Sequence, residues 1–217
     1  GFGGAGCPTD TAVTSLTSGV RTSKAGSSIA GGHDLNGDSV PDVVIGGEEF
    51  EATDGTDTGI VWFISGSYIN GLSSQTATQA STNPTFHSFG AALSNPKLRI
   101  QGSDLDERFG AAVSMVPNLE SDGRAGILVG HPGSWELDYA EAGGASLYRF
   151  DLANGGAFGT HPYVHLTGET SNWGAELGLA VSAANHPTNP LICIGGYWGQ
   201  GSGLDRGSAY VIPVPVP

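Results

Sequence analysis

Short strands that end in glycine recur along this chain at a nearly constant spacing. Three apolar-Gly steps each begin a candidate strand: Ala25-Gly26, Phe109-Gly110 and Trp173-Gly174. About 20 residues after each step, a second apolar strand runs into glycine, in DVVIGG, GILVG and LICIGG. Self-similarity at a fixed period indicates a repeat protein, in which each copy is one small unit of strands that packs against its neighbours.

Two further strands accompany each step. The third strands open on glycine and carry an aromatic residue, beginning at Gly59, Gly144 and Gly207. The fourth elements are short and precede each step, in LTSG, RIQG and HLTG. Four short strands repeated at about 64 residues favour a propeller blade over a sandwich, whose strands need no such period. We therefore predict an all-β fold of three four-stranded, propeller-type blades.

The predicted propeller-like domain spans residues 1–212, with repeats at about 16–99, 100–165 and 166–212. The first repeat is longer because the Ser/Thr/Asn-rich stretch 68–96 lies between its third and fourth strands, and we predict a long surface loop there. Proline donates no backbone hydrogen bond, so the closing PVPVP, residues 213–217, predicts the start of an extended linker.

The number of repeats is lower than a closed propeller needs, since known propellers have four to eight blades. The first unit has an extra strand ahead of it, at 12–18, while the third unit has only three strands. We expect the strand at 12–18 to complete a last blade. Three arrangements stay open: a fragment of a longer propeller, a ring closed by another copy of the chain, or a head-to-tail filament.

The loop before the second strand of the first repeat reads HDLNGDSVPD and carries three aspartates and an asparagine. Together with the apolar-Gly step, VVIGG and the Gly-x-Val-aromatic strand, it resembles the FG-GAP repeat, the blade unit of the integrin alpha-subunit propeller and of many surface proteins. This resemblance implies a bound Ca²⁺ held by Asp34, Asn36, Asp38, the backbone carbonyl of Val40, and Asp42.

The residue types in this loop support the same ion. Hard oxygen ligands at alternating positions around a tight glycine turn suit the high coordination number of calcium. No His or Cys lies between them, which argues against zinc. An EF-hand is excluded because its twelfth position must be a bidentate Glu, and that position is Ile45, inside a predicted strand.

The corresponding loops of the other repeats depart from the pattern. The second repeat offers Asn118, Glu120 and Asp122 but has Gly126 where the last aspartate belongs, so we predict a weaker second metal site there. The third repeat keeps only Asn185 in register, and we expect no metal there.

The charge of the chain limits the classes of partner that it can bind and the compartment in which we expect it. A formal net charge of -13 disfavours nucleic acid and anionic membrane surfaces, and no apolar stretch is long enough to cross a bilayer. Acidic excess suits secreted or cell-surface proteins that meet millimolar calcium. The chain starts with Gly1, which we interpret as a processed or excised piece. Cys7 and Cys193 could form a disulfide or remain two free thiols, and the sequence leaves both alternatives open.

No residue pattern points to catalysis. His161 and His165 lie four apart without a third ligand at metal spacing, His131 and His186 fall in predicted loops, and no G-x-S-x-G elbow is present. The acidic run Asp104–Glu107 predicts a solvated turn.

These observations favour a non-enzymatic, calcium-stabilised extracellular adhesion or structural module. We expect it to contact other protein chains, either through self-association at open blade edges or through the rest of a longer chain. The alternative is a lectin-like propeller that stacks glycans on the loop tryptophans Trp135, Trp173 and Trp198.

Overall fold

The computed structural model describes residues 15–17, 23–51, 56–71, 86–88, 98–134, 142–152, 156–158, 161–168, 176–186, 189–201 and 204–216. Within these ranges the chain is built almost entirely of β-strands, together with the short helix α1 (Gly66–Gly71). The predicted all-β fold of propeller-type blades is therefore confirmed. None of the described helices has the length and apolar character needed to cross a membrane.

The first blade is a four-stranded antiparallel sheet. Its strands are β2 (Ser28–Gly31), β3 (Val43–Gly47), β4 (Ile60–Ile64) and β6 (Arg99–Gln101), hydrogen-bonded in that order. The two middle strands read VVIGG and IVWFI. Such runs of β-branched and aromatic residues suit a sheet that is covered on both faces.

The second blade repeats this arrangement. Its strands are β7 (Ala112–Val116), β8 (Gly126–Gly130), β9 (Gly144–Tyr148) and β12 (Val164–Thr167), and neighbours pair antiparallel in that order. A two-stranded hairpin of β10 (Phe150–Asp151) and β11 (Ala157–Phe158) follows β9.

The third blade has three strands, β13 (Ala180–Ala184), β14 (Leu191–Gly201) and β15 (Leu204–Pro213), paired in chain order. The last two are long and continue past a register shift between Gly196 and Gly199. Cys193 on β14 carries a free thiol, and Cys7 lies outside the described residues.

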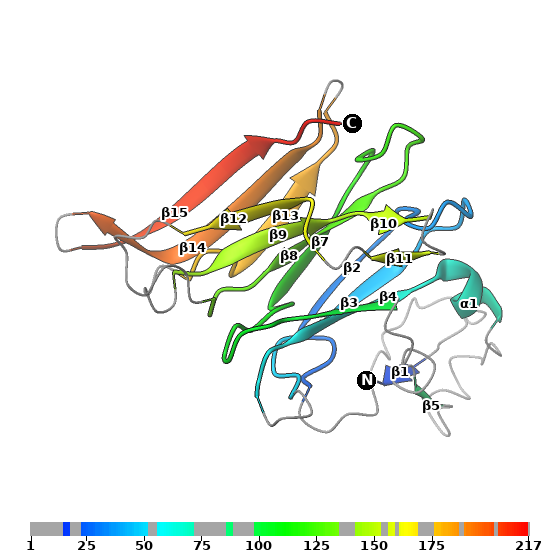
Figure 1. The fold of residues 1–217 in the computed structure, drawn as a ribbon, viewed down its shortest axis with the longest axis horizontal. Coiled ribbons are helices and arrows are strands. Elements are labelled where there is room, and N and C mark those ends of the chain that lie inside the picture. Colours follow the sequence, from blue (N-terminus) through cyan, green and yellow to red (C-terminus); the bar gives the residue numbers. More distant parts are fainter. Residues whose placement is uncertain are drawn as a thin grey trace, which may run out of the picture.

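The three blades stand side by side, with the first strand of the second blade between the first strands of the other two (Figure 1). Alternate residues of β8 point to opposite sides, so Ile127 and Val129 pack toward the first blade with Val44. On the other side Leu128 packs with Ile192 and Ile194 of the third blade. Each gap between blades is therefore filled by its own apolar cluster.

The blades are displaced by one strand from the predicted repeats. The RIQG strand, β6, pairs with β4 of the first blade, and the HLTG strand, β12, pairs with β9 of the second. Each fourth strand thus completes the sheet that comes before it in the chain. This pairing is physically favoured because an antiparallel strand joins its immediate predecessor through a short connection.

The apolar-Gly step of the third repeat lies four residues later than predicted. Gly26 and Gly110 have φ values of 96° and 86° and donate their amides to Gly46 and Gly130 at 2.9 and 3.0 Å. In the third blade Gly178, with φ 93°, donates to Gly195 at 3.0 Å. The step is therefore Leu177-Gly178, and the assignment to Trp173-Gly174 was wrong.

The prediction for the N-terminal strand is also wrong. The strand expected at 12–18 is present as β1 (Ser15–Thr17), but it pairs in parallel with β5 (Phe86–Ser88), within the stretch predicted as a long loop. The third blade lies at the opposite end of the row of blades, so β1 does not complete it (Figure 1).

The proline-rich end is part of the fold. Pro213 is the last residue of β15. Val214 is 2% exposed, belongs to the apolar cluster between the second and third blades, and donates its amide to the carbonyl of Pro190 at 2.9 Å. The linker predicted from Pro213 onward was therefore wrong as far as Val214, because alternating prolines leave the valine side chains able to pack.

Candidate functional site

The acidic loop of the first blade, residues 33–42, connects β2 to β3. The amide of Asp42 donates to the carbonyl of His33 at 2.9 Å, so the two ends of the loop meet at the end of the sheet. Gly37 and Ser39 have positive φ values of 82° and 63°. These two left-handed residues let the chain turn tightly enough to bring its side-chain oxygens together.

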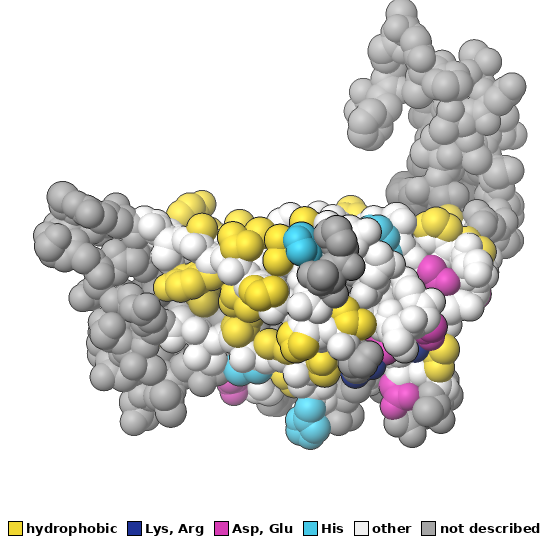
Figure 2. All heavy atoms as spheres, turned by 90° about the horizontal axis from the view of Figure 1, so that it is seen from above, with side chains coloured by type: hydrophobic (Ala, Val, Ile, Leu, Met, Phe, Trp, Pro, Cys, Tyr) yellow, Lys and Arg dark blue, Asp and Glu magenta, His cyan; other side chains and the backbone are white. Residues whose placement is uncertain are grey.

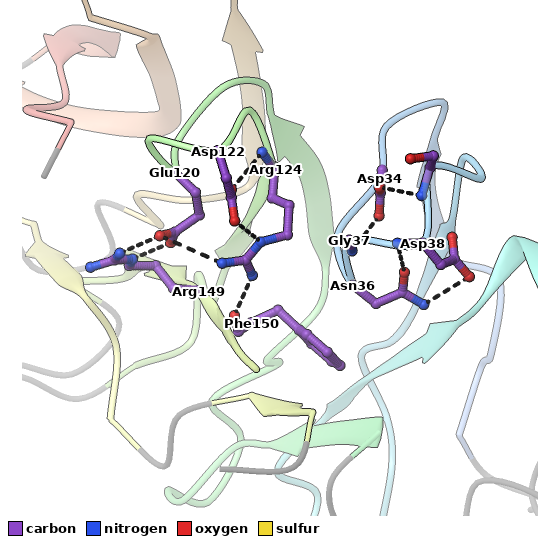
Figure 3. Close-up of polar contacts among 10 residues, drawn as sticks. Asp34, Asn36, Gly37, Asp38, Glu120, Asp122, Arg124, Arg149 and Phe150 are labelled. Carbon is purple, nitrogen blue, oxygen red and sulfur yellow. Dashed lines mark hydrogen bonds and ion pairs between the residues drawn. The ribbon is translucent and has the colours of Figure 1, made fainter. Parts of the chain in front are cut away.

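Asp34, Asn36 and Asp38 are oriented by the backbone of the loop itself (Figure 3). The two carboxylate oxygens of Asp34 accept hydrogen bonds from the amides of Gly37 and Ser39 at 2.6 and 2.7 Å. The side-chain oxygen of Asn36 accepts one from the amide of Asp38 at 3.0 Å. The loop is therefore preorganised, with its oxygen donors held in place by its own amides.

Asp38 also accepts hydrogen bonds from the hydroxyl groups of Ser65, which precedes α1, and of Ser67, within α1. The Ser67 hydroxyl donates to Oδ2 of Asp38 at 2.7 Å, and the Val40 amide donates to Oδ1 at 2.9 Å. These hydrogen bonds lower the pKa of Asp38, because they stabilise its ionised form.

Asp42 is fully buried. Its two carboxylate oxygens accept hydrogen bonds from the amides of Leu35 and Gly66, at 2.8 and 2.9 Å. Burial nevertheless raises the pKa of Asp42, since the charged form loses contact with water. Within the described part of the chain, none of Asp34, Asp38 and Asp42 forms a salt bridge. A buried carboxylate of this kind is stabilised by a nearby cation.

The residue types of the loop suit a calcium ion, although no three acidic, histidine or cysteine side chains in the described part of the chain form a metal-holding group. Three carboxylates, one side-chain amide and the carbonyl of Val40 are all hard oxygen ligands, the type that Ca²⁺ prefers. They lie within nine residues of one turn, and all three carboxylates are without an arginine or lysine partner among the residues described. The calcium site at these residues therefore stays a prediction.

The second loop is arranged differently, because arginines occupy the surroundings of its acidic groups (Figure 3). Arg124 donates to Asp122 at 2.8 Å and to the carbonyl of Phe150 at 2.8 Å. Both carboxylate oxygens of Glu120, which is 9% exposed, accept from Arg149. Two guanidinium groups therefore neutralise this loop, and a metal ion would have to displace them. The geometry argues against the weaker second site.

The third member of that predicted second site is also engaged. The Asn118 side-chain amide donates to the side-chain oxygen of Asn185 at 3.1 Å, so the loops of the second and third blades are joined by a hydrogen bond. The two loops of the first and second blades are joined as well, because the amide of Ala125 donates to the carbonyl of Asp34 at 2.9 Å.

Sequence reasoning missed a buried polar cluster between the first and second blades. His131 follows β8, is 0% exposed, and forms a 3.0 Å hydrogen bond through Nε2 with the hydroxyl of Ser146, which in turn bonds His165 at 2.8 Å. Glu107 was predicted to lie in a solvated turn, but it is 7% exposed, with Oε1 3.9 Å from Nδ1 of His131.

This cluster has the residue types of a hydrolase but not the exposure. Ser146 is 2% exposed, so its hydroxyl is not presented to a substrate, and burial lowers the pKa of His131 to about 3. The remaining carboxylates of that predicted turn, Asp104 and Asp106, are exposed. The signal for the cluster is spatial, since Glu107 precedes β7 whereas His131 follows β8, and only the fold brings them together.

A cavity of about 570 Å³ lies beside the acidic loop. It is lined by apolar groups that include Phe63, Tyr68 and Leu152, and by Asn36 and Asp38 of the loop itself. Of the tryptophans proposed for glycan stacking, Trp135 and Trp173 lie outside the described residues. Trp198 is on β14, where its side chain is not described.

Comparison with known families and proteins gives one match. The FG-GAP repeat family matches residues 25–64, the segment from the first apolar-Gly step through the acidic loop to the end of β4. No curated protein matches the chain significantly. FG-GAP repeats form propeller blades, are typically non-enzymatic structural or adhesion modules, and are typical of extracellular or surface proteins. Residues 25–64, which include the acidic loop and three strands of the first blade, are therefore an FG-GAP repeat.

Proposed function

We propose that this chain is a non-enzymatic, calcium-stabilised extracellular module that works through contacts with other protein chains. The observation that carries the proposal is Asp42, a buried carboxylate at the base of a preorganised loop whose other oxygen donors are also without a cationic partner among the described residues. Calcium in the millimolar range outside cells would be available to such a site.

The role of the ion would be structural. Bound by Asp34, Asn36, Asp38, Val40 and Asp42, it would hold the loop to the end of the first blade. The loop in turn contacts the second blade, through the hydrogen bond from Ala125 to Asp34 and through the packing of Gly37 near Arg124. Calcium would therefore stiffen the contact between two blades as well as the loop itself.

Removal of calcium should lower the melting temperature of the protein. A ligand that binds only the folded state at about 100 times its Kd adds roughly 2.7 kcal/mol, which for a chain of this size corresponds to a shift of about 5–10 °C. Calorimetry or thermal fluorescence with and without a chelator measures the shift, and isothermal titration should give one site per chain.

Two matched variants separate the loops. Asp38→Asn keeps the shape of the side chain but removes one ligand charge, and should abolish most of the calcium-dependent shift. Asp122→Asn makes the same change in the arginine-rich second loop and should leave the shift intact. Equal melting temperatures with calcium and with chelator, in the unmodified protein, would contradict the calcium site.

The cavity beside the acidic loop favours a second candidate function, that of a glycan-binding propeller. An apolar cavity that includes the ring of Tyr68, 41% exposed, next to polar loop groups has the mixed character of a sugar site. A glycan array tests this: a saturable signal that is lost in Tyr68→Ala would favour the lectin, and an array without a signal would reject it.

A further inference from the structure

The blades meet through one repeated contact, in which a glycine of each second strand lies against the turn that opens the next blade. The Cβ of any larger residue at Gly46 would overlap the carbonyl oxygen of Gly110, and one at Gly130 would overlap the carbonyl oxygen of Gly178. The Ser28 hydroxyl adds a hydrogen bond across the first contact, to the carbonyl of Gly110 at 2.7 Å. Neighbouring blades therefore approach each other to backbone contact at these two positions.

Gly195 is the third member of this series, and no described residue of another blade lies against it. It accepts the hydrogen bond from the turn of its own blade just as Gly46 and Gly130 do. A Cβ added to Gly195 would meet only ordinary neighbours of its own sheet, Ala180 Cβ at 3.7 Å and Ser208 O at 3.8 Å. In the first two blades this position is kept small by the neighbouring blade, and at Gly195 no described blade packs on it.

The sheet face around Gly195 matches, position by position, faces that are buried elsewhere in the chain. In the second blade the row across the sheet is Ser114, Leu128, Leu147, and in the third blade it is Ser182, Cys193, Val211. Leu128 and Leu147 are 0% exposed, whereas Val211 is 63% exposed.

The rest of this outward face is small or apolar. The rows on either side of Cys193 consist of Ala180, Gly195, Ala209 and of Ala184, Leu191, Pro213. None of these residues is charged, although the chain carries a net charge of -13. On the face seen in Figure 2, hydrophobic side chains gather in the centre and on the left, and most of the visible acidic side chains lie on the right.

Part of the opposite half of the contact is exposed at the other end of the row, on β2 and the turn before it. The turn at Gly26 corresponds to those at Gly110 and Gly178, yet a Cβ added to Gly26 would meet no atom of the described residues within 4 Å. Ile29 on β2 is 63% exposed, while Val113, at the same place on β7, is 9% exposed because it packs against the first blade. On the same face of the first blade, Ile45 and Trp62 are only 6% and 2% exposed, so the open part of this face is its first strand, β2.

We propose that the third blade binds the first blade of a second copy of this chain, head to tail, with the Gly26 turn and Ile29 of one copy seated on the face around Gly195, Cys193 and Val211 of the other. This rests on the proposed function as a module of protein contacts and names its partner. The two surfaces are complementary because they continue the β2–β7 and β7–β13 contacts. Since they differ, the contact is heterologous and produces a closed ring or a filament.

Sedimentation velocity over a range of concentrations tests the association. The unmodified protein should form species larger than a monomer as the concentration rises. Gly195→Val places a branched side chain where the next blade must touch the backbone, and should leave a monomer at every concentration. Leu105→Lys changes a residue that is 58% exposed outside the proposed surfaces and should associate like the parent.

The melting temperature of the Gly195→Val monomer shows whether it is folded, and Ile29→Lys disrupts the other half of the contact as a second variant. A folded parent that remains monomeric throughout would overturn the inference. The calcium-dependent melting shift is measured separately on the monomer, so the failure of one proposal is distinguishable from the failure of the other.

Oxidative cross-linking tests the direction of the contact. In a Cys7→Ser background, Ile29→Cys should form a disulfide with Cys193 of the neighbouring copy, because Ile29 corresponds to Val113 and Cys193 to Val44, two residues that share one apolar cluster. Denaturing gels should then show a ladder beyond the dimer, or a closed ring of fixed size. Dimers alone, formed equally well by Cys7→Ser without the second change, would indicate a face-to-face contact of third blades and would overturn the head-to-tail arrangement.

Discussion

Lowering the pH from 7 to 4 should destabilise this protein, and replacing His131 by glutamine should remove much of that acid sensitivity. His131 is fully buried, and burial lowers its pKa to about 3. The unfolded chain takes up this proton near pH 6.5, but the folded chain does so only near pH 3. Stability therefore falls as the pH drops between these values, by about 1.4 kcal/mol per pH unit, or about 3 kcal/mol at pH 4.

The surroundings of His131 also favour its neutral form, in agreement with its lowered pKa. Its ring stacks on that of His165 with 5.3 Å between centroids, so a second histidine charge would repel it, and among the described residues Nδ1 has no hydrogen-bond partner. Glu107 acts in the opposite direction. Burial raises its pKa, so the folded state takes up that proton first on acidification, and this offsets part of the loss caused by His131.

Urea unfolding at several pH values measures the effect. His131→Gln keeps a hydrogen-bonding group beside Ser146 but does not titrate, and should show a flatter dependence of unfolding free energy on pH. The exposed His161 provides the matched control, since His161→Gln should follow the parent. Glu107→Gln should steepen the acid loss. An identical pH dependence in His131→Gln and the parent would disprove this role of His131.

Gly130→Ala should destabilise the fold strongly, whereas Gly195→Ala should be nearly neutral in the monomer. The added methyl group at Gly130 would overlap the backbone carbonyl of Gly178, which belongs to the neighbouring blade and cannot move without separating the two sheets. Overpacking of this kind costs roughly 1–3 kcal/mol or more. At Gly195 the same methyl group meets its nearest neighbour at 3.7 Å, an ordinary contact.

Chemical denaturation at low protein concentration, where association is weak, compares the two variants directly. The two glycines occupy equivalent positions in their own sheets, so local strand propensity affects both alike. A difference in unfolding free energy then reports the presence or absence of a following blade. Equal destabilisation by the two substitutions would show that the glycines are required by their own sheets and not by contact between blades.

Most of the local structure could be predicted from the sequence. VVIGG and IVWFI are apolar runs bounded by turn residues, and both are strands, as are GILVG and the strand from Leu191. The acidic loop was also predicted in place, because its aspartates alternate around a glycine within one turn. Backbone preferences and side-chain period act over a few residues, and a sequence displays them directly.

The errors concern contacts between distant residues. Trp173-Gly174 and Leu177-Gly178 are equally good apolar-Gly steps, and the hydrogen bond of Gly178 to Gly195 and its approach to Gly130 of the preceding blade identify the second one as the turn. The burial of Val214 likewise depends on the apolar cluster that the second and third blades form together. No local pattern encodes these distances.

The sequence by itself determined the strands, the repeat and the acidic loop, since each depends on neighbours along the chain. The tertiary structure decided that Arg124 and Arg149 neutralise the second loop and that Glu107 meets His131 in the interior. It also decided which copy of the repeated contact is left exposed at Gly195. The physical reason is that charge pairing and burial depend on separation in space, which arises only when the blades pack side by side.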